Sequence, residues 1–206
     1  MIVTAIEPKR KGLSALYIDG EFALKLDTEV LLSHRIDVGT EIDDDKLKEV
    51  IDASNIKRAK DKAMWLISYR DHAQKELVDK VAKDYGRDAA QKAVDRLVEL
   101  GLINDERYAY RYASDLLNIK HLSKNGAVRK LIEKGIDKEL AYETVESLDY
   151  DAYESIKALI DKKYARYLGD EKGRRRCVNA LLRLGYSYSD VKSVLREYTD
   201  TDEYDY

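Results

Sequence analysis

The octapeptide Val-Arg-Lys-Leu-Ile-Glu-Lys-Gly at residues 128–135 has a counterpart, Val-Asn-Ala-Leu-Leu-Arg-Leu-Gly, at residues 178–185. In both, apolar residues three and four apart share one face of a helix, and the glycine can adopt the left-handed conformation that ends it. A related stretch from Leu77 to Val81 precedes Gly86, with extra residues before the glycine. The three glycines lie 49 and 50 residues apart. With a connecting helix added, this period predicts three tandem units of three helices each.

Residues 101–113 place an acidic pair beside arginine and three tyrosines, which is compatible with an active site or with a joint between two helices. Asn104 or Asp105 can cap a helix, and Tyr108 and Tyr112 then share one of its faces. An active site would need a base or a metal partner, and the sequence offers neither. We therefore interpret the stretch as a joint.

The N-terminal residues predict a small β element ahead of the helices. Asp19 and Gly20 form a two-residue loop between apolar runs, and this pair favours a type I′ hairpin because glycine accepts a positive φ. Three consecutive aspartates, at residues 43–45, offer N-cap oxygens to a helix that begins near Lys46. The predicted strands occupy residues 2–6, 13–18 and 21–26.

The charge of the chain is unevenly distributed. Charged residues make up 37% of the 206, with one proline, and this composition favours charge-laced helices over a turn-rich β protein. The formal net charge is -3, yet the ten residues after Arg196 hold five carboxylates and no base. Residues 157–196 hold eleven Lys or Arg against four Asp or Glu, a net charge of +7. A basic face of this kind is a plausible footprint for phosphate groups.

Several classes of function lack a motif in this sequence. The single cysteine, Cys177, excludes an internal disulfide framework and fits a reducing compartment, and its apolar helical setting favours a buried, inert thiol. The three histidines are widely separated, so no metal site is expected, and no nucleotide-binding or esterase motif is present. We expect no cofactor. Neither a signal peptide nor a membrane span is visible, so we expect a cytoplasmic protein.

The basic residues are the candidates for a binding surface. Lysines and arginines on exposed helix faces can neutralise backbone phosphates, and neighbouring tyrosines can stack on unpaired bases. The sequence places Lys162, Lys163 and Arg166 on one helix face, whereas an ordinary solvated face would make surface ion pairs only. The candidate contact residues are Arg129, Lys130, Lys134, Lys162, Lys163, Arg166, Lys172, Arg174, Arg175, Arg176 and Arg183.

Three segments of the chain resemble the RecX family, the regulators of the bacterial recombinase RecA. They are residues 102–109, 131–139 and 181–191, and the resemblance covers roughly residues 57–198. The N-terminal β segment is similar to the extension found in family members from Gram-positive bacteria. The sequence departs from the family at residues 84–87, where Asp-Tyr-Gly-Arg replaces a Lys-Gly-Phe-like turn, and at Ala127, where proline is common.

The resemblance implies a regulator without enzymatic activity. Its expected fold is mainly α, with tandem three-helix repeats in an elongated, curved array and a small N-terminal β-hairpin-containing segment. The implied partners are the RecA filament and single-stranded DNA, with inhibition of strand exchange, ATP turnover and the SOS response in DNA repair. The protein is expected to act as a monomer. Two other functions stay open from the residues alone: a general nucleic-acid-binding helical module, and a helical protein-interaction scaffold without DNA binding.

The expected organisation has five parts. An N-terminal β-containing segment occupies residues 1–55, and three-helix repeats occupy residues 56–107, 108–152 and 153–198. An acidic tail occupies residues 199–206. Such a tail acts either as a disordered solubilising end or as a competitor of DNA for the basic face.

Overall fold

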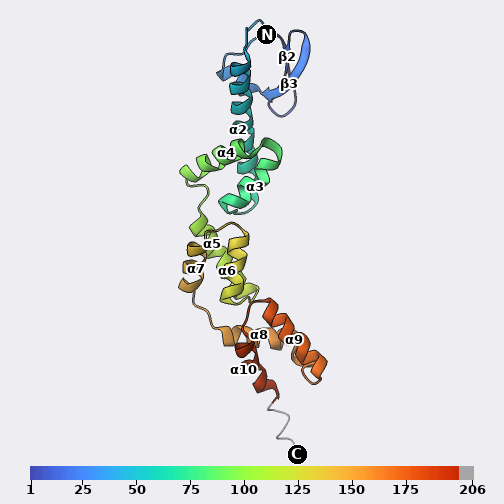
Figure 1. The fold of residues 1–206 in the computed structure, drawn as a ribbon, viewed down its shortest axis with the longest axis vertical. Helices are drawn as coiled ribbons and strands as arrows, with labels where there is room; N and C mark the ends of the chain where they lie inside the picture. The colour runs from blue at the N-terminus through green and yellow to red at the C-terminus, as the bar shows by residue number, and fades with distance from the viewer. Residues whose placement is uncertain (200–206) are drawn as a thin grey trace, which may run out of the picture. The chain divides into compact units, whose positions relative to one another are not determined.

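The computed structural model describes residues 1–199, which fall into two compact units that meet in sequence between Asn104 and Asp105 (Figure 1). Most of the described residues are helical, as predicted. The first unit contains a small sheet followed by helices, and the second is helical in its described part. Residues 200–206, which hold most of the predicted acidic tail, lie outside the described residues. No helix in the described part of the chain is long and apolar enough to cross a bilayer.

A three-stranded antiparallel sheet opens the first unit, with the strands in the order β1 (Val3–Pro8), β2 (Leu13–Ile18) and β3 (Glu21–Asp27). Asp19 has a φ of 50° and Gly20 a φ of 89°, and positive φ at both central positions defines the predicted type I′ turn. The predicted hairpin is therefore confirmed. One face of the sheet packs on α1 (Thr28–Ser33) and on the start of α2 (Asp44–Tyr69).

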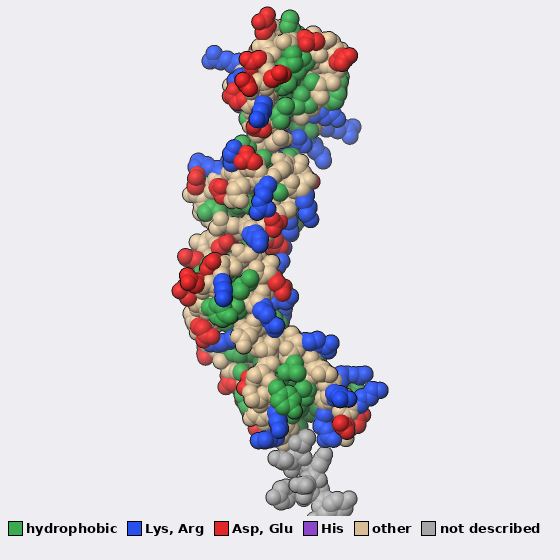
Figure 2. Space-filling view, in the orientation of Figure 1, with side chains coloured by type: hydrophobic (Ala, Val, Ile, Leu, Met, Phe, Trp, Pro, Cys, Tyr) green, Lys and Arg blue, Asp and Glu red, His purple; other side chains and the backbone are tan. Residues whose placement is uncertain are grey.

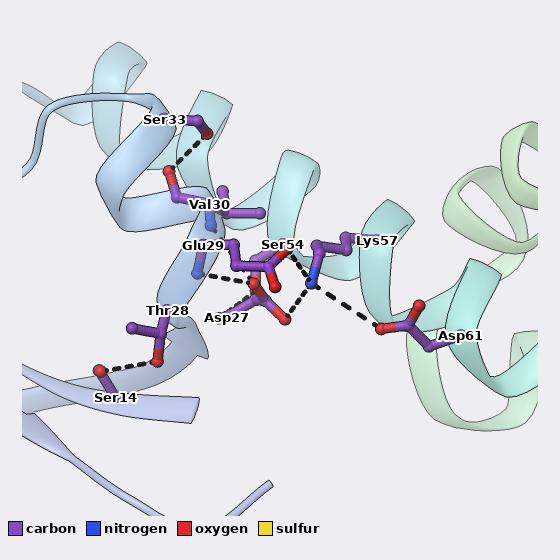
Figure 3. A network of polar contacts seen from close by, with 9 residues as sticks. All are labelled: Ser14, Asp27, Thr28, Glu29, Val30, Ser33, Ser54, Lys57 and Asp61. Atoms are coloured by element: carbon purple, nitrogen blue, oxygen red, sulfur yellow. Dashed lines mark hydrogen bonds and ion pairs between the residues drawn. The ribbon is translucent and has the colours of Figure 1, made fainter. Parts of the chain in front are cut away.

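A polar network fixes the end of the sheet on the middle of α2 (Figure 3). The carboxylate of Asp27 accepts hydrogen bonds from the backbone N–H groups of Glu29 and Val30 and so caps α1. Its second oxygen lies 3.1 Å from Nζ of Lys57, and its own backbone N–H donates to Oγ of Ser54 at 2.8 Å. One turn of α2 therefore holds both the last residue of β3 and the first turn of α1.

The first three-helix domain consists of the second half of α2 with α3 (Gln74–Tyr85) and α4 (Arg87–Glu99). Its core includes Ala63, Leu77 and Val94, all without exposed surface. Gly86, with a φ of 79°, ends α3 and directly precedes α4, so a single residue makes the turn. The unusual sequence at residues 84–87 therefore forms a shorter connection than the turns at Gly135 and Gly185.

The second three-helix domain consists of α5 (Asp105–Ser114), α6 (Lys124–Glu133) and α7 (Lys138–Ser147). A π-helical turn, η1 (Asp115–Ile119), extends α5 and was not predicted from the sequence. The rings of Tyr108 and Tyr112 lie 5.6 Å apart on α5. Residues 101–104 connect α4 to α5, which confirms that the stretch at residues 101–113 contains a joint between helices.

The third three-helix domain consists of α8 (Ala152–Lys163), α9 (Glu171–Arg183) and α10 (Tyr188–Thr199). Ile156, Leu159, Cys177, Leu181 and Val191 are buried in its core. Gly135 and Gly185 have φ values of 91° and 96°, so both perform the predicted role at the helix ends. The boundaries predicted between the repeats stay a prediction, and α2 runs without a break across residue 55.

Candidate nucleic-acid interface

Helix α9 carries the densest set of predicted contact residues. The helix begins after Asp170, whose carboxylate accepts a hydrogen bond from the backbone N–H of Gly173. Gly173, Cys177 and Leu181 follow each other at intervals of four and are buried, so the opposite side of the helix faces solvent. Arg174 is half-buried, and the exposed cations are Lys172, Arg175, Arg176 and Arg183.

A short 3₁₀ turn, η2 (Ala165–Tyr167), lies against the first turn of α9 because Gly173 has no side chain. A Cβ atom at this position would overlap the backbone carbonyl of Tyr167. The guanidinium carbon of Arg166 lies 4.7 Å from the centroid of the Tyr167 ring, which is within the range of a cation–π contact. The fold therefore brings a cation and an exposed tyrosine next to the basic start of α9.

The predicted helix face shared by Lys162, Lys163 and Arg166 is wrong. Helix α8 ends at Lys163, and Arg166 lies in η2. The chain leaves the helix here because Leu168 turns into the core of the third domain. Lys162 and Lys163 are exposed in the last turn of α8, where lysine is favourable for the helix dipole.

Eight cations of the third domain form what we call the α9 basic surface: Lys162, Lys163, Arg166, Lys172, Arg174, Arg175, Arg176 and Arg183. Within residues 1–199, none of them forms an ion pair with a carboxylate. In Figure 2, Lys and Arg side chains gather over the part of the molecule where Figure 1 places α9. The surface is therefore a concentration of positive charge without ion pairs among the described residues.

One of these charges, that of Lys172, is unfavourable for the helix itself, whereas Arg183 in the last turn is favourable. Lys172 lies in the first turn, at the positive end of the helix dipole, and the three arginines follow in the next turn. A cation in the first turn costs roughly 0.3–1 kcal/mol when exposed. The helix dipole therefore does not account for Lys172 at this position.

The three candidate cations of the second domain have other contacts. Nζ of Lys130 lies 2.6 Å from the carboxylate of Glu133, and this pairing raises the pKa of Lys130. Lys134 has an interaction of its own within the structure. The guanidinium of Arg129 reaches the turn at Gly185, where a Cβ would lie 2.8 Å from its Nη2 atom. These residues therefore contribute less free positive charge than the α9 basic surface.

A polar joint between the second and third domains was not foreseen from the sequence. The hydroxyl of Tyr186 lies 2.9 Å from the backbone carbonyl of His121, from Oγ of Ser155 and from the hydroxyl of Tyr150. Burial raises the pKa of both tyrosines, so their hydroxyls stay protonated and can donate at neutral pH. One feature of the sequence could have predicted this joint: Tyr186, which has a polar hydroxyl, stands at the position that the apolar Ile136 occupies in the second domain.

Two side chains with reactive chemistry, Cys177 and His72, are buried. Cys177 is buried in the core, as predicted, and this burial raises the pKa of its thiol to about 11. Nδ1 of His72 donates to the backbone carbonyl of Arg70, 2.9 Å away, and burial lowers the pKa of His72. Among residues 1–199, no three His, Cys, Asp or Glu side chains are grouped closely enough to hold a metal ion.

The fold defines a helical protein of three tandem three-helix domains, preceded by a small sheet and carrying an uncompensated basic surface. Family models of RecX match all three domains: the first three-helix domain at residues 59–97, the second at residues 104–144 and the third at residues 149–195. The chain belongs to the RecX family. The family assigned by resemblance is therefore confirmed.

Known relatives extend the match to nearly the whole chain. The regulatory protein RecX of Clostridioides difficile is 27% identical, with 99% of each chain covered. That of Clostridium tetani is 28% identical and covers 97% of this chain and 95% of its own. These names support a regulatory role for this chain.

Solved structures have the same fold. A crystal structure of regulatory protein RecX covers 95% of this chain and 98% of its own, with a TM-score of 0.65 at 23% identity. The crystal structure of RecX from Lactobacillus salivarius covers 71% of this chain and 98% of its own, with a TM-score of 0.58 at 26% identity.

Proposed function

We propose that the protein binds the RecA filament on single-stranded DNA and inhibits RecA-driven ATP hydrolysis and strand exchange. In this role it regulates DNA repair and the SOS response in the cytoplasm. It acts without catalysing a reaction, as a monomer. Its membership of the RecX family supports the regulatory role, and RecA is the partner that the family resemblance implies.

The observation that carries the proposal is the uncompensated charge of the α9 basic surface. Three consecutive arginines, Arg174, Arg175 and Arg176, have no carboxylate partner within the described chain, and they follow a lysine at the unfavourable end of the helix dipole. Phosphates of a DNA strand would supply the missing countercharge, with release of bound counterions as the driving force. Arg166 and Tyr167 lie beside them and can stack on an unpaired base.

The test measures ATP hydrolysis by RecA on single-stranded DNA while the protein is titrated in. We expect suppression at substoichiometric ratios, and we expect the variant R174A/R175A/R176A to need at least about tenfold more protein, because each lost phosphate contact weakens binding. The matched control is R87A/K92A/R96A, which removes the same charge from cations that already form ion pairs with Asp79, Asp88 and Glu99.

Three outcomes contradict the proposal. Constant ATP turnover at a large excess of the unmodified protein removes RecA as its target. Tight DNA binding combined with no effect on RecA indicates a general nucleic-acid-binding module. Filament binding that is equally strong in the arginine variant and in the control indicates a protein scaffold, in which the α9 basic surface has no part.

A further inference from the structure

The N-terminal sheet has an outer face on which positive charge and exposed aromatic rings occur together. Side chains alternate between the two faces of a strand, and Leu16, Ile18 and Leu26 define the core face. The strand pairing places Tyr17 opposite Phe22 and places Ala15 opposite Lys25 on the other face. We call this the sheet outer face: Ala5, Glu7, Leu13, Tyr17, Phe22 and Lys25 around the buried Ala15, together with the turn at residues 9–12.

The turn between β1 and β2 contributes unpaired cations to one end of this face. Lys9, Arg10 and Lys11 are consecutive and exposed, and neither Arg10 nor Lys11 forms an ion pair within residues 1–199. Lys25, on β3, is also exposed and without an ion pair in that range. With Lys9 included, four cations gather around the single carboxylate of Glu7, whereas the other three carboxylates of residues 1–27, Asp19, Glu21 and Asp27, lie at the hairpin turn and at the end of β3.

The carboxylate of Glu7 on this face already has an ion-pair partner and a hydrogen-bond donor. Glu7 accepts from Nζ of Lys9 at 2.7 Å and from the hydroxyl of Tyr17 at 3.2 Å. Its repulsion of an incoming phosphate is therefore reduced by its own neighbours. Arg10, Lys11 and Lys25 keep their charge available.

The turn is held rigidly, so the cations are presented on a defined scaffold. The backbone N–H of Lys9 donates to the carbonyl of Leu13 at 2.7 Å, and that of Thr28 donates to the carbonyl of Gly12 at 2.8 Å. Lys11 and Gly12 both have a positive φ, of 62° and 69°. A pre-ordered turn loses little conformational freedom when it binds a ligand.

An aromatic pair occupies the other end of the face. The rings of Tyr17 and Phe22 lie 5.8 Å apart in an edge-to-face arrangement. Phe22 is the only phenylalanine of the chain and is 55% exposed, although the core face of the same sheet would bury it. An exposed ring and a half-buried ring on an antiparallel sheet that also carries cations have the chemistry that binds unpaired bases and their phosphates.

We propose that the sheet outer face is a second binding site, specific for single-stranded nucleic acid, in which Phe22 and Tyr17 stack on bases and Arg10, Lys11 and Lys25 contact phosphates. The site lies in the first unit and does not include the α9 basic surface. It binds the strand in the absence of RecA, so it goes beyond the proposed regulatory function.

The test measures binding of the full chain to a fluorescent oligothymidylate by anisotropy over a range of salt concentrations, without RecA. The variant R10S/K11S should weaken binding and reduce the slope of log affinity against log salt by about 1.4, since each phosphate contact on a single strand contributes about 0.7. The variant F22S should weaken binding about fivefold or more with an unchanged slope, whereas F22Y, which keeps the ring, should bind normally.

The matched control is K48S/K92S, which removes two exposed lysines from α2 and α4 of the same unit. Three results overturn the site: no binding of the unmodified chain at low salt, equal binding by R10S/K11S, F22S and the control, or a loss in R10S/K11S without a loss in F22S. Normal DNA binding by both variants with impaired capture by the RecA filament assigns the face to a protein partner and also overturns it.

Each of the two proposals can be disproved without disproving the other. The anisotropy experiment contains no RecA, and its variants leave the α9 basic surface intact. A negative result with R174A/R175A/R176A in the ATP hydrolysis assay therefore leaves the sheet site standing. A negative result with R10S/K11S and F22S likewise leaves the RecA proposal standing.

Discussion

Gly173 controls the local geometry of the α9 basic surface, because its missing side chain lets η2 approach the first turn of the helix. Alanine at this position overlaps the backbone carbonyl of Tyr167, which cannot rotate away as a side chain does. We expect Gly173→Ala to reduce the free energy of unfolding by roughly 1–3 kcal/mol, the usual range for overpacking. Urea denaturation followed by circular dichroism measures the change.

Gly169 provides the matched control for this substitution. It is exposed, and a Cβ built there meets no atom within 4 Å, so Gly169→Ala should change stability by less than about 0.5 kcal/mol. Gly173→Ala should also weaken DNA binding, because it displaces Arg166 from the start of α9. A Gly173→Ala protein with unchanged stability and unchanged DNA affinity would contradict this role.

Sequence patterns predict single residues well where the helical period alone determines burial. The interval of four between Gly173, Cys177 and Leu181 places the cysteine in the core, as the structure confirms. Arg129 shows the limit, because its contact with the turn at Gly185 joins residues more than fifty positions apart. No local pattern contains that information, so Arg129 could only be predicted as an exposed cation.

At the scale of elements, the connection between the sheet and α2 depends on one carboxylate. Asp27 is 5% exposed and supplies both the cap of α1 and the contact to Lys57 (Figure 3). Replacement by alanine removes the cap and a charge-assisted hydrogen bond. We expect Asp27→Ala to lower the free energy of unfolding by roughly 2–4 kcal/mol, measured by urea denaturation.

Asp61 is the control for Asp27, since it also faces Lys57. Its carboxylate lies 4.0 Å from Nζ of Lys57 and is 68% exposed, so Asp61→Ala should cost less than about 1 kcal/mol. Equal effects of the two substitutions would show that the capping role of Asp27 is unimportant. The buried Ser54, which accepts from the backbone N–H of Asp27, makes such equality unexpected.

The turns were more predictable than the helices between them. Positive φ at Gly135, Gly185 and Gly20 follows from glycine being the residue that accepts it, so the repeat and the hairpin could be predicted from these positions. Gly86 also marks a turn, but it does not indicate that a single residue joins α3 to α4, and the π-helical turn η1 has no such marker. Both features depend on how buried side chains such as Leu116 and Leu117 fit the core, which only the packed structure specifies.

At the scale of the molecule, the two positively charged surfaces that the two proposals use belong to different units. The sheet outer face belongs to the first unit and the α9 basic surface to the second. The formal net charge of -3 conceals this distribution, which becomes clear only when charges are assigned to segments.

Each unit should fold on its own, because each contains buried cores of its own. The cores around the sheet and around α3 and α4 lie within residues 1–104, and the core of α8, α9 and α10 lies within the second unit. We expect fragments 1–104 and 105–206 to give helical circular dichroism spectra and cooperative thermal transitions. Fragments 1–85 and 86–206 form the control, since that cut removes Val94 and Leu97 from the first core.

The same fragments locate the DNA contacts. Both should bind oligothymidylate with a smaller salt slope than the full chain, because each holds only part of the cationic residues. Fragment 1–104 should lose its binding with R10S/K11S, and fragment 105–206 should lose it with R174A/R175A/R176A. A first fragment that folds cooperatively but has no affinity for the strand would place all nucleic-acid contacts in the second unit, leaving the exposed Phe22 without a ligand.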